Sequence, residues 1–230
     1  MLATDGVMGV PVKSDINLIN FPIKLQIPGQ YNVSNALAAA AVADILKISK
    51  NKIISSLAKF PGVEGRMQKI DIGQKFNVII DFAHTPNSLK NALTALRSQV
   101  HQKSKVIAVF GAAGERDKSK RQKMGEIAAE LADITVITAE DPRKETVEDI
   151  SKQIITGLEK KGKRENKNYY QIADRQEAIN FAITIAKDGD TVGLFGKGHE
   201  KSMSYSGREL AWSEVDAAKR AITKRLNEKQ

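Results

Sequence analysis

The pattern of hydrophobic and polar positions changes at about residue 63. Before it, short apolar runs broken by prolines predict irregular β-structure over residues 1–28, followed by two helices. The first helix is expected to begin after Asn32, with Ser34 as its cap, and its alanine-rich face should pack closely against another element. The second helix covers residues 50–59 and ends at a proline–glycine pair that marks a linker.

From about residue 68 onward, short apolar runs alternate with segments that are expected to be helical. The runs lack polar alternation, which is typical of strands buried on both faces of a parallel sheet. Strands are predicted at residues 76–81, 105–110, 134–138, 169–172 and 191–195, with helices opening near Pro86, before Met124, after Thr146 and after a cap at Asp174, then a turn at 206–207 and a last helix from Ser213. This alternation predicts a doubly wound, Rossmann-like α/β domain over residues 63–230, and residues 1–62 are assigned to the end of a preceding domain.

The composition excludes several kinds of site. The chain has 230 residues, of which 41% are hydrophobic and 27% charged, as in ordinary globular proteins. It has no cysteine, which excludes disulfides, thiolate metal sites and cysteine nucleophiles. The amino terminus lacks the pattern of a signal peptide, and the longest apolar run, residues 36–43, is too short to span a bilayer. These observations predict a cytoplasmic protein without a membrane partner.

Lysine and arginine cluster at residues 118–123, 160–164 and 219–225, and the formal net charge is +9 at pH 7. Such a surface can attract nucleic acid, nucleotide phosphates or acidic substrates. Aromatic residues make up only 5% of the chain, and no basic cluster is interleaved with rings that could stack on bases. We therefore interpret most of these residues as solvated helix faces and expect no nucleic-acid partner.

The first two predicted strands of the α/β domain run into polar loops. Asp81 and His84 follow the first strand, where they could contact a ribose, magnesium or a neighbouring cation, or only cap the next helix. Gly111 and Gly114 follow the second strand and allow a ligand to approach the backbone. Arg116 in the same loop is suited to a carboxylate, or to an ion pair within the loop. The loop lacks the Gly-Lys-Ser/Thr ending of a phosphate-binding loop.

The third and fifth strands also end in charged loops. Residues 139–143 place two acids beside an arginine, as a substrate with both an amine and a carboxylate requires, although a capped turn is the alternative. Residues 196–200 combine two glycines with lysine, histidine and glutamate, a set that turns rarely need. Ligands of open parallel sheets bind beyond the carboxyl ends of the strands. Four polar loops on that edge therefore predict a small-molecule site.

The order and approximate spacing of these motifs resemble the Mur ligase family over about residues 25–222. The general motifs are Asn32-Val-Ser-Asn35-Ala-Leu-Ala-Ala, Gly65-Arg66-Met67 and Asp81-Phe-Ala-His-Thr-Pro. Three further motifs resemble the MurE branch, which adds the third amino acid of the peptidoglycan stem peptide. They are Phe110-Gly-Ala-Ala-Gly-Glu-Arg-Asp with Lys120-Arg121, then Glu140-Asp141-Pro142-Arg143, then Gly196-Lys197-Gly198-His199-Glu200.

The resemblance implies an enzyme of three domains that uses ATP and Mg²⁺ to form an amide. A UDP-binding domain and a central ATPase domain would precede a Rossmann-like carboxyl-terminal domain. The substrate carboxylate of UDP-N-acetylmuramoyl-L-alanyl-D-glutamate becomes an acyl phosphate, which the amine of diaminopimelate or lysine attacks. Such catalysis depends on positioning and on charge stabilisation.

The resemblance also implies roles for individual residues. Those expected around the nucleotide are Asn35, Arg66 and Asp81, with His84 and Asn87 near its ribose or base, and Arg66 and Asp81 are expected to take part in catalysis. Those expected to hold the incoming amino acid are Arg116, Asp141, Arg143, Gly196 and Glu200, with Lys120, Lys197 and His199 nearby. No metal ligand is expected in this chain.

The sequence departs from the family pattern in two ways. The usual Asp-Asn-Pro-Arg is Glu140-Asp141-Pro142-Arg143 here, which puts the third amino acid in question, while Arg143 favours diaminopimelate over lysine. The family's Gly-Thr-x-Gly-Lys-Thr loop and its central-domain glutamate, histidine and carbamylated lysine have no counterpart in the 230 residues. We therefore expect these groups to lie upstream of Met1, and expect no ATP hydrolysis by this chain alone.

Two other interpretations remain open at this point. Folylpolyglutamate synthase and cyanophycin synthetase share the fold and the ATP chemistry, but the Gly196-Lys-Gly-His-Glu200 loop argues against both. A stand-alone module that binds amino acids or nucleotides is the non-enzymatic alternative.

Overall fold

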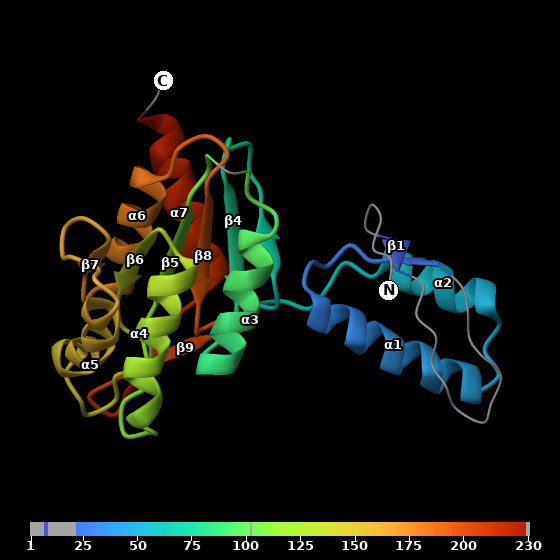
Figure 1. The fold of residues 1–230 in the computed structure, drawn as a ribbon, viewed down its shortest axis with the longest axis horizontal. Coiled ribbons are helices and arrows are strands. Elements are labelled where there is room, and N and C mark those ends of the chain that lie inside the picture. The colour runs from blue at the N-terminus through green and yellow to red at the C-terminus, as the bar shows by residue number, and fades with distance from the viewer. Residues whose placement is uncertain (1–6, 9–21, 102, 229–230) are drawn as a thin grey trace. The chain divides into compact units, whose positions relative to one another are not determined.

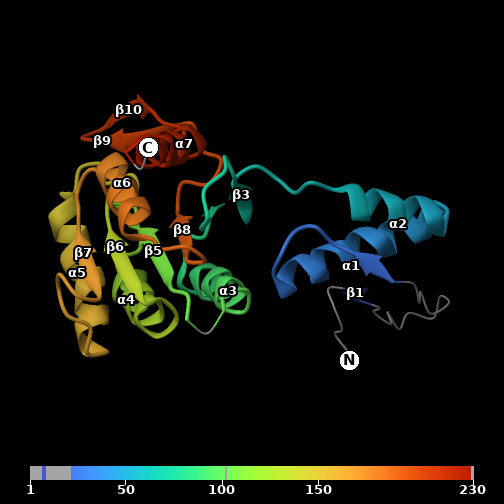
Figure 2. The ribbon, with the colours of Figure 1, turned by 90° about the horizontal axis from the view of Figure 1, so that it is seen from above.

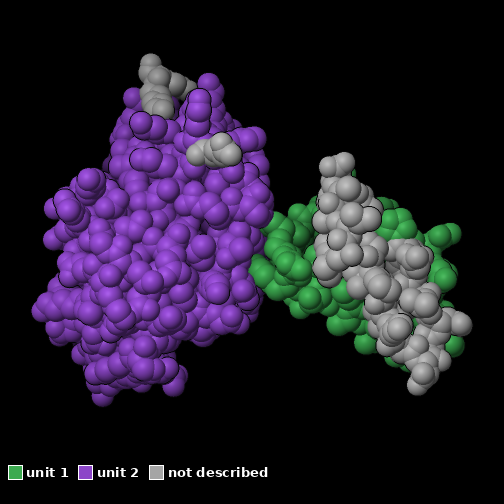
Figure 3. Space-filling view, viewed as in Figure 1, with its two compact units in different colours: residues 1–63 green, residues 64–230 purple. Residues whose placement is uncertain are grey.

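The computed structural model describes residues 7–8, 22–101 and 103–228. The chain divides into two compact units, residues 1–63 and 64–230 (Figure 3). Within the described residues, no helix has the length and apolar character needed to cross a membrane.

The first unit has one antiparallel pair of two-residue strands and two helices around a small core. Strand β1 (Val7–Met8) pairs antiparallel with β2 (Ile23–Lys24), and the helices are α1 (Gln30–Ile45) and α2 (Lys50–Lys59). Ile23, Ala40 and Ile53 form the buried centre. Most of the segment for which irregular β-structure was expected lies outside the described residues.

The start of α1 corrects the sequence prediction. The helix begins at Gln30 rather than after Asn32, so Ser34 lies inside it and caps nothing. Gly29 takes the N-cap position with φ 102°, and the Asn32 side chain donates a hydrogen bond to Pro28 O at 2.7 Å. Asn32 thus stabilises the entry to the helix from within its first turn. Of the alanine-rich helix only Ala40 is buried, so close packing of its small residues occurs on one side.

The second unit is built on a six-stranded sheet in the order β3-β4-β8-β5-β6-β7 (Figure 1). All neighbouring pairs are parallel except β3 with β4. The strands are β3 (Gln68–Ile70), β4 (Asn77–Asp81), β5 (Val106–Phe110), β6 (Ile134–Ile137), β7 (Tyr169–Gln171) and β8 (Thr191–Phe195). The predicted α/β class and the five predicted strands are confirmed, and the antiparallel edge strand β3 was not predicted.

Helices cover both faces of this sheet (Figure 2). On one face lie α3 (Pro86–Arg97), α4 (Ser119–Leu131) and α5 (Val147–Lys160), and on the other α6 (Arg175–Ile185) and α7 (Glu214–Asn227). The core under α6 and α7 joins their alanines and isoleucines to the central strands, which is the burial that a doubly wound sheet requires. A hairpin of β9 (Ser202–Tyr205) and β10 (Arg208–Ala211) follows β8.

Helices α4 and α5 cross at two glycines. A Cβ atom on Gly125 would lie 2.0 Å from Ile154 O, and one on Gly157 would lie 2.0 Å from Gln122 O. The helix backbones therefore approach more closely than any side chain would allow.

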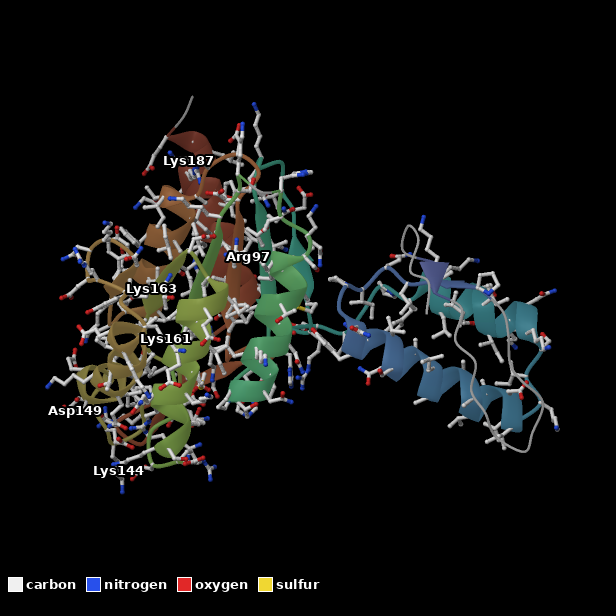
Figure 4. The ribbon with its side chains drawn as sticks, in the orientation of Figure 1. Arg97, Lys144, Asp149, Lys161, Lys163 and Lys187 are labelled. Atoms are coloured by element: carbon white, nitrogen blue, oxygen red, sulfur yellow. The ribbon has the colours of Figure 1, made fainter. Side chains whose placement is uncertain are left out.

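The basic cluster at residues 160–164 is partly engaged in ion pairs with α4. Lys160 lies 3.0 Å from a Glu126 carboxylate oxygen, and Lys161 lies 2.6 Å from one of Glu130. Figure 4 shows Lys161 and Lys163 on this helical side of the second unit. Lys160 and Lys161 are exposed at the carboxyl end of α5, which agrees with the interpretation from the sequence, whereas Arg121 and Arg225 of the other two basic clusters are buried.

Candidate active site at the carboxyl edge of the sheet

The strand order brings the polar loops together. Strand β8 lies between β4 and β5, and β6 lies beyond β5, so the carboxyl ends of these four parallel strands share one edge (Figure 1). After β4 and β5 the chain leads to α3 and α4 on one face of the sheet, whereas after β8 it leads to α7 on the other face; such a switch point is where open α/β sheets bind ligands.

Lys197 lies at the centre of an acidic cluster. Its side chain is only 1% exposed, and its Nζ lies 2.8 Å from Asp141 Oδ1 and 2.8 Å from Glu200 Oε2. Asp141 Oδ1 also accepts a hydrogen bond from Ser204 N at 2.9 Å. The buried lysine therefore joins the loop after β6 to the loop after β8 and to strand β9.

Glu140 extends this cluster inward. Its side chain is 6% exposed, and its Oε2 has no hydrogen-bond partner among the described residues. Burial raises the pKa of Glu140 from an ordinary 4.5 to about 7, with the Asp141 carboxylate adding to the rise and nearby cations opposing it. Gly196 is required beside it, since a Cβ there would lie 2.8 Å from Glu140 Cγ and its φ is +107°.

The cluster has the dimensions of a cation site. Glu140, Asp141 and Glu200 bring one carboxylate oxygen each within 4.8 Å of one another. The Lys197 ammonium already pairs with two of the three acids. A cation from the ligand would therefore meet Glu140 as the unpaired acid.

Arg143 follows in the same loop and is held by its backbone. Its N–H donates to Ser204 O at 3.0 Å, and its φ is 55°, a left-handed conformation that costs a non-glycine residue energy. Its buried Nε has no hydrogen-bond partner among the described residues. The loop thus carries an unpaired donor as well as an unpaired acceptor.

A buried ion pair supports the loops from below. Arg175 and Glu214 are 0% exposed and lie 2.6 Å apart, and Trp212 Nε1 donates to Glu214 Oε2 at 2.7 Å. Arg175 also donates to Ala139 O and Phe195 O, both at 2.9 Å. It therefore fixes the points at which the loops after β6 and β8 leave the sheet.

A second group of side chains surrounds Phe82. The Arg66 guanidinium lies 4.6 Å from the Phe82 ring centroid, and the rings of His84 and His199 lie 4.6 and 5.2 Å away. Close backbone packing holds this group, because a Cβ on Gly65 would lie 2.2 Å from His199 N. The arrangement presents a cation and two imidazoles around one ring.

Asp81 shapes the loop rather than facing outward. Its two carboxylate oxygens accept hydrogen bonds from Met67 N at 2.8 Å and Ala83 N at 2.9 Å. Burial raises its pKa above the ordinary 3.8, although both hydrogen bonds oppose the rise. The cap of α3 is Thr85 with Ser88, so the alternative that Asp81 or His84 caps this helix is wrong.

The loop after β5 is tied to the loop after β6 by Arg121, a motif residue for which no structural role was predicted. The Arg121 side chain is 0% exposed and pairs with Glu145 at 2.8 Å, and it donates to Ala113 O at 2.9 Å. The ion pair holds the pKa of Glu145 down at about 2. Lys120 beside it donates to His84 O at 2.9 Å, which links α4 to the Phe82 group.

The structure brings together most, but not all, of the predicted site residues. The acidic cluster contains Asp141, Lys197, Glu200 and Gly196, with Arg143 in the same loop, and the Phe82 group contains Arg66, His84, His199 and Lys120. Arg116 and Asn87 are exposed, and no hydrogen bond or ion pair joins either to these groups among the described residues. Asn35 lies in the first unit, where it donates to Asn32 Oδ1 at 3.4 Å.

The sequence did not single out the buried pair Arg175 and Glu214. Glu140 was noted as one of two acids in its loop but was not among the residues expected to hold the substrate. Arg175 and Glu214 lie 39 positions apart along the chain. A buried ion pair of this kind leaves no local pattern in the sequence.

Comparison with known proteins decides the family. Residues 65–198 match the family described as Mur ligase, glutamate ligase domain. The chain belongs to the Mur ligase family. The resemblance stated from the motifs is therefore confirmed.

Curated Mur ligase relatives resemble this chain over most of its length. The UDP-N-acetylmuramyl-tripeptide synthetase of Roseiflexus sp. (strain RS-1) is 42% identical over 199 residues, covering 86% of this chain and 39% of the relative. The UDP-N-acetylmuramoyl-L-alanyl-D-glutamate--2,6-diaminopimelate ligase of Syntrophomonas wolfei subsp. wolfei is 45% identical over 178 residues, covering 77% and 35%. The chain thus spans about two fifths of the length of these Mur ligases.

Solved Mur ligase structures have the same fold. The structure of a UDP-N-acetylmuramoyl-L-alanyl-D-glutamate--2,6-diaminopimelate ligase matches with a TM-score of 0.65 at 30% identity, covering 90% of this chain and 41% of that one. MurF from Thermotoga maritima in complex with ADP also has a TM-score of 0.65, at 19% identity, covering 99% and 46%. The second likeness concerns the fold alone.

Proposed function

We propose that this chain carries the amino-acid-binding part of an ATP-dependent ligase that joins diaminopimelate to UDP-N-acetylmuramoyl-L-alanyl-D-glutamate. One observation carries the proposal. The same loop holds a buried acceptor without a hydrogen-bond partner, Glu140 Oε2, and a buried donor without one, Arg143 Nε. An amino acid with a side-chain amine and a side-chain carboxylate complements both. The similarity to the diaminopimelate ligase of Syntrophomonas wolfei supports this substrate class.

Arg143 is the residue on which the choice of diaminopimelate rests. Its guanidinium can fork onto a carboxylate, and lysine lacks that second carboxylate. Asp141 and Glu200 are fixed by Lys197 and form the acidic side of the pocket. Arg116 is exposed at the rim, where it can approach a charged substrate.

The residues present fit a nucleotide at the Phe82 group. Arg66 is exposed and makes no direct ion pair among the described residues, although its charge acts on the nearby Asp81 carboxylate, and His84 Nδ1 is engaged with Phe82 O, which leaves Nε2 for a ligand. ATP supplies the phosphoryl group that activates the substrate carboxylate. Arg66 would meet its anionic part, and His84 with Asn87 its ribose or base, while Asp81 holds the loop in place.

Mg²⁺ has no assigned ligand in this part of the enzyme. Among the described residues, the acid cluster with the dimensions of a metal site is that of Glu140, Asp141 and Glu200, and Lys197 neutralises part of it. We place the main phosphate and metal ligands in the portion of the Mur ligases that this chain does not span.

A chimera tests the proposal. The chain is joined to the preceding portion of the Roseiflexus synthetase, and phosphate release is measured with diaminopimelate, lysine or glutamate as the acceptor. We expect diaminopimelate to be preferred, and Arg143→Ala to lower that preference by about tenfold or more, as for a lost charged contact. Preference for lysine or glutamate, or an unchanged preference in the variant, would contradict the assignment.

Calorimetry with the 230-residue chain distinguishes the ligase from the non-enzymatic alternative, a stand-alone binding module. Tight binding of an amino acid by the chain, combined with an inactive chimera, would favour a stand-alone binding module.

A further inference from the structure

Lys197 is a buried lysine at the candidate site to which the proposed function assigns no role. Its side chain is 1% exposed, so it cannot extend into solvent, and both of its ion-pair partners belong to the acidic cluster. Asp141 lies 56 positions away along the chain, so the lysine holds together two loops that the sheet only brings near. Ser204 N completes the fixation of Asp141 from β9.

Lys197 also lowers the negative charge of the acidic cluster. Glu140, Asp141 and Glu200 are three acids whose ligand atoms lie within 4.8 Å of one another. Without an internal cation, three carboxylates at this separation would repel one another or collect a divalent ion. With Lys197 in place, two of them are paired and oriented, and Glu140 remains without a hydrogen-bond partner at Oε2.

We propose that Lys197 is a positioning residue whose ammonium serves as a fixed internal cation, orienting Asp141 and Glu200 and leaving Glu140 to receive one side-chain ammonium of the incoming amino acid. This inference rests on the proposed function for the identity of the substrate. The resemblance placed Asp141 and Glu200, and not Glu140, among the residues that hold the incoming amino acid. Both already face a cation supplied by the protein.

The first test asks whether Lys197 occupies a cation position, and it does not depend on ligase activity. In the 230-residue chain, Lys197→Met should create a site for Mn²⁺, measured by calorimetry and by the electron paramagnetic resonance of bound ion. We expect affinity at least about tenfold above that of the unmodified chain, because three carboxylate oxygens then lack a cation. Lys197→Arg should restore the original weak binding, since a guanidinium can pair with both acids.

Lys201→Met is the matched control. Lys201 lies in the same loop, is exposed and pairs with Glu64 instead of the cluster, so its replacement should leave Mn²⁺ binding unchanged. Circular dichroism checks that each variant is folded. A folded Lys197→Met chain that gains no Mn²⁺ affinity over the control overturns the role of Lys197.

The second test asks which acid reads the ammonium. Calorimetry compares diaminopimelate with 2-aminopimelate, which has the second carboxylate but no side-chain amine, on the unmodified chain and on Glu140→Gln. We expect the preference for diaminopimelate to fall by about tenfold in the variant, the loss of one charged contact. A preference that is unchanged in Glu140→Gln overturns the role of Glu140, whereas absence of amino-acid binding by the unmodified chain counts against the proposed function and leaves the Mn²⁺ result to decide on Lys197.

Discussion

Replacing Glu140 by glutamine should change how the stability of the second unit depends on pH. Burial raises the pKa of Glu140 from 4.5 to about 7 in the folded chain. The Asp141 carboxylate adds to this rise, and the opposing charges are those of Lys197, Arg175 and Lys120. Glutamine keeps the shape of the side chain and cannot ionise.

The sign follows from proton binding. Because the folded pKa lies above the unfolded one, the folded chain binds more protons between pH 4.5 and 7, and its free energy of unfolding falls as the pH rises through that window. The full effect of Glu140 is about 3 kcal/mol, at about 1.4 kcal/mol for each pH unit between the two pKa values. The Glu140→Gln chain does not undergo this loss. The free energy of unfolding of the variant minus that of the unmodified chain should therefore rise by about 3 kcal/mol between pH 4.5 and 7.5.

Urea denaturation at several pH values measures this difference. Trp212 lies in the second unit and its fluorescence reports on that unit, with circular dichroism as the second probe. The raised pKa of Asp81 contributes equally to both chains and cancels in the comparison. Glu209→Gln, at an exposed position of β10, is the control and should show no such pH dependence. A stability difference that stays constant from pH 4.5 to 7.5 would refute the reasoning.

Three further outcomes are expected. Glu214→Ala should lower the free energy of unfolding by about 3–5 kcal/mol in urea, because it leaves the fully buried Arg175 without its counter-ion; a loss below about 1 kcal/mol would contradict the importance of that pair. Gly125→Ala should lower the free energy of unfolding by about 1–3 kcal/mol, because the added methyl group pushes α4 and α5 apart. Lys123→Ala, on the exposed side of α4, should change the free energy of unfolding little. Equal losses in the two variants would speak against the close helix crossing. The 230-residue chain by itself should show no magnesium-dependent ATP hydrolysis, since it has no phosphate-binding loop, and measurable turnover in a coupled phosphate assay would disprove this.

Elements with a strong local signal were predictable from the sequence. The strand β8 (Thr191–Phe195) has the predicted bounds, because five apolar or β-branched positions are all buried between two neighbouring strands. Asp174 caps α6 as expected, accepting a hydrogen bond from Glu177 N at 2.8 Å. Strand β3 was missed because it has only three residues with mixed burial and is held by pairing with β4.

The site was predictable in location and less so in detail. The four polar loops were correctly placed on one edge, since the carboxyl ends of parallel strands point the same way. The choice of ion-pair partners depends on the order of the strands and on the conformations of the loops that follow them. No local sequence pattern encodes either. The burial of Lys197 and the exposure of Arg116 are therefore results of the tertiary structure.

Arg175 separates the support of the pocket from its chemistry. It donates hydrogen bonds to the carbonyls of Ala139 and Phe195, where the loops after β6 and β8 leave the sheet, and no hydrogen bond joins it to the side chains of these two loops among the described residues. Variation confined to residues 140–143 and 197–200 can then alter what the pocket accepts without disturbing its foundation. Libraries that randomise these two segments and retain Arg175 are a direct route to ligases with new amino-acid acceptors.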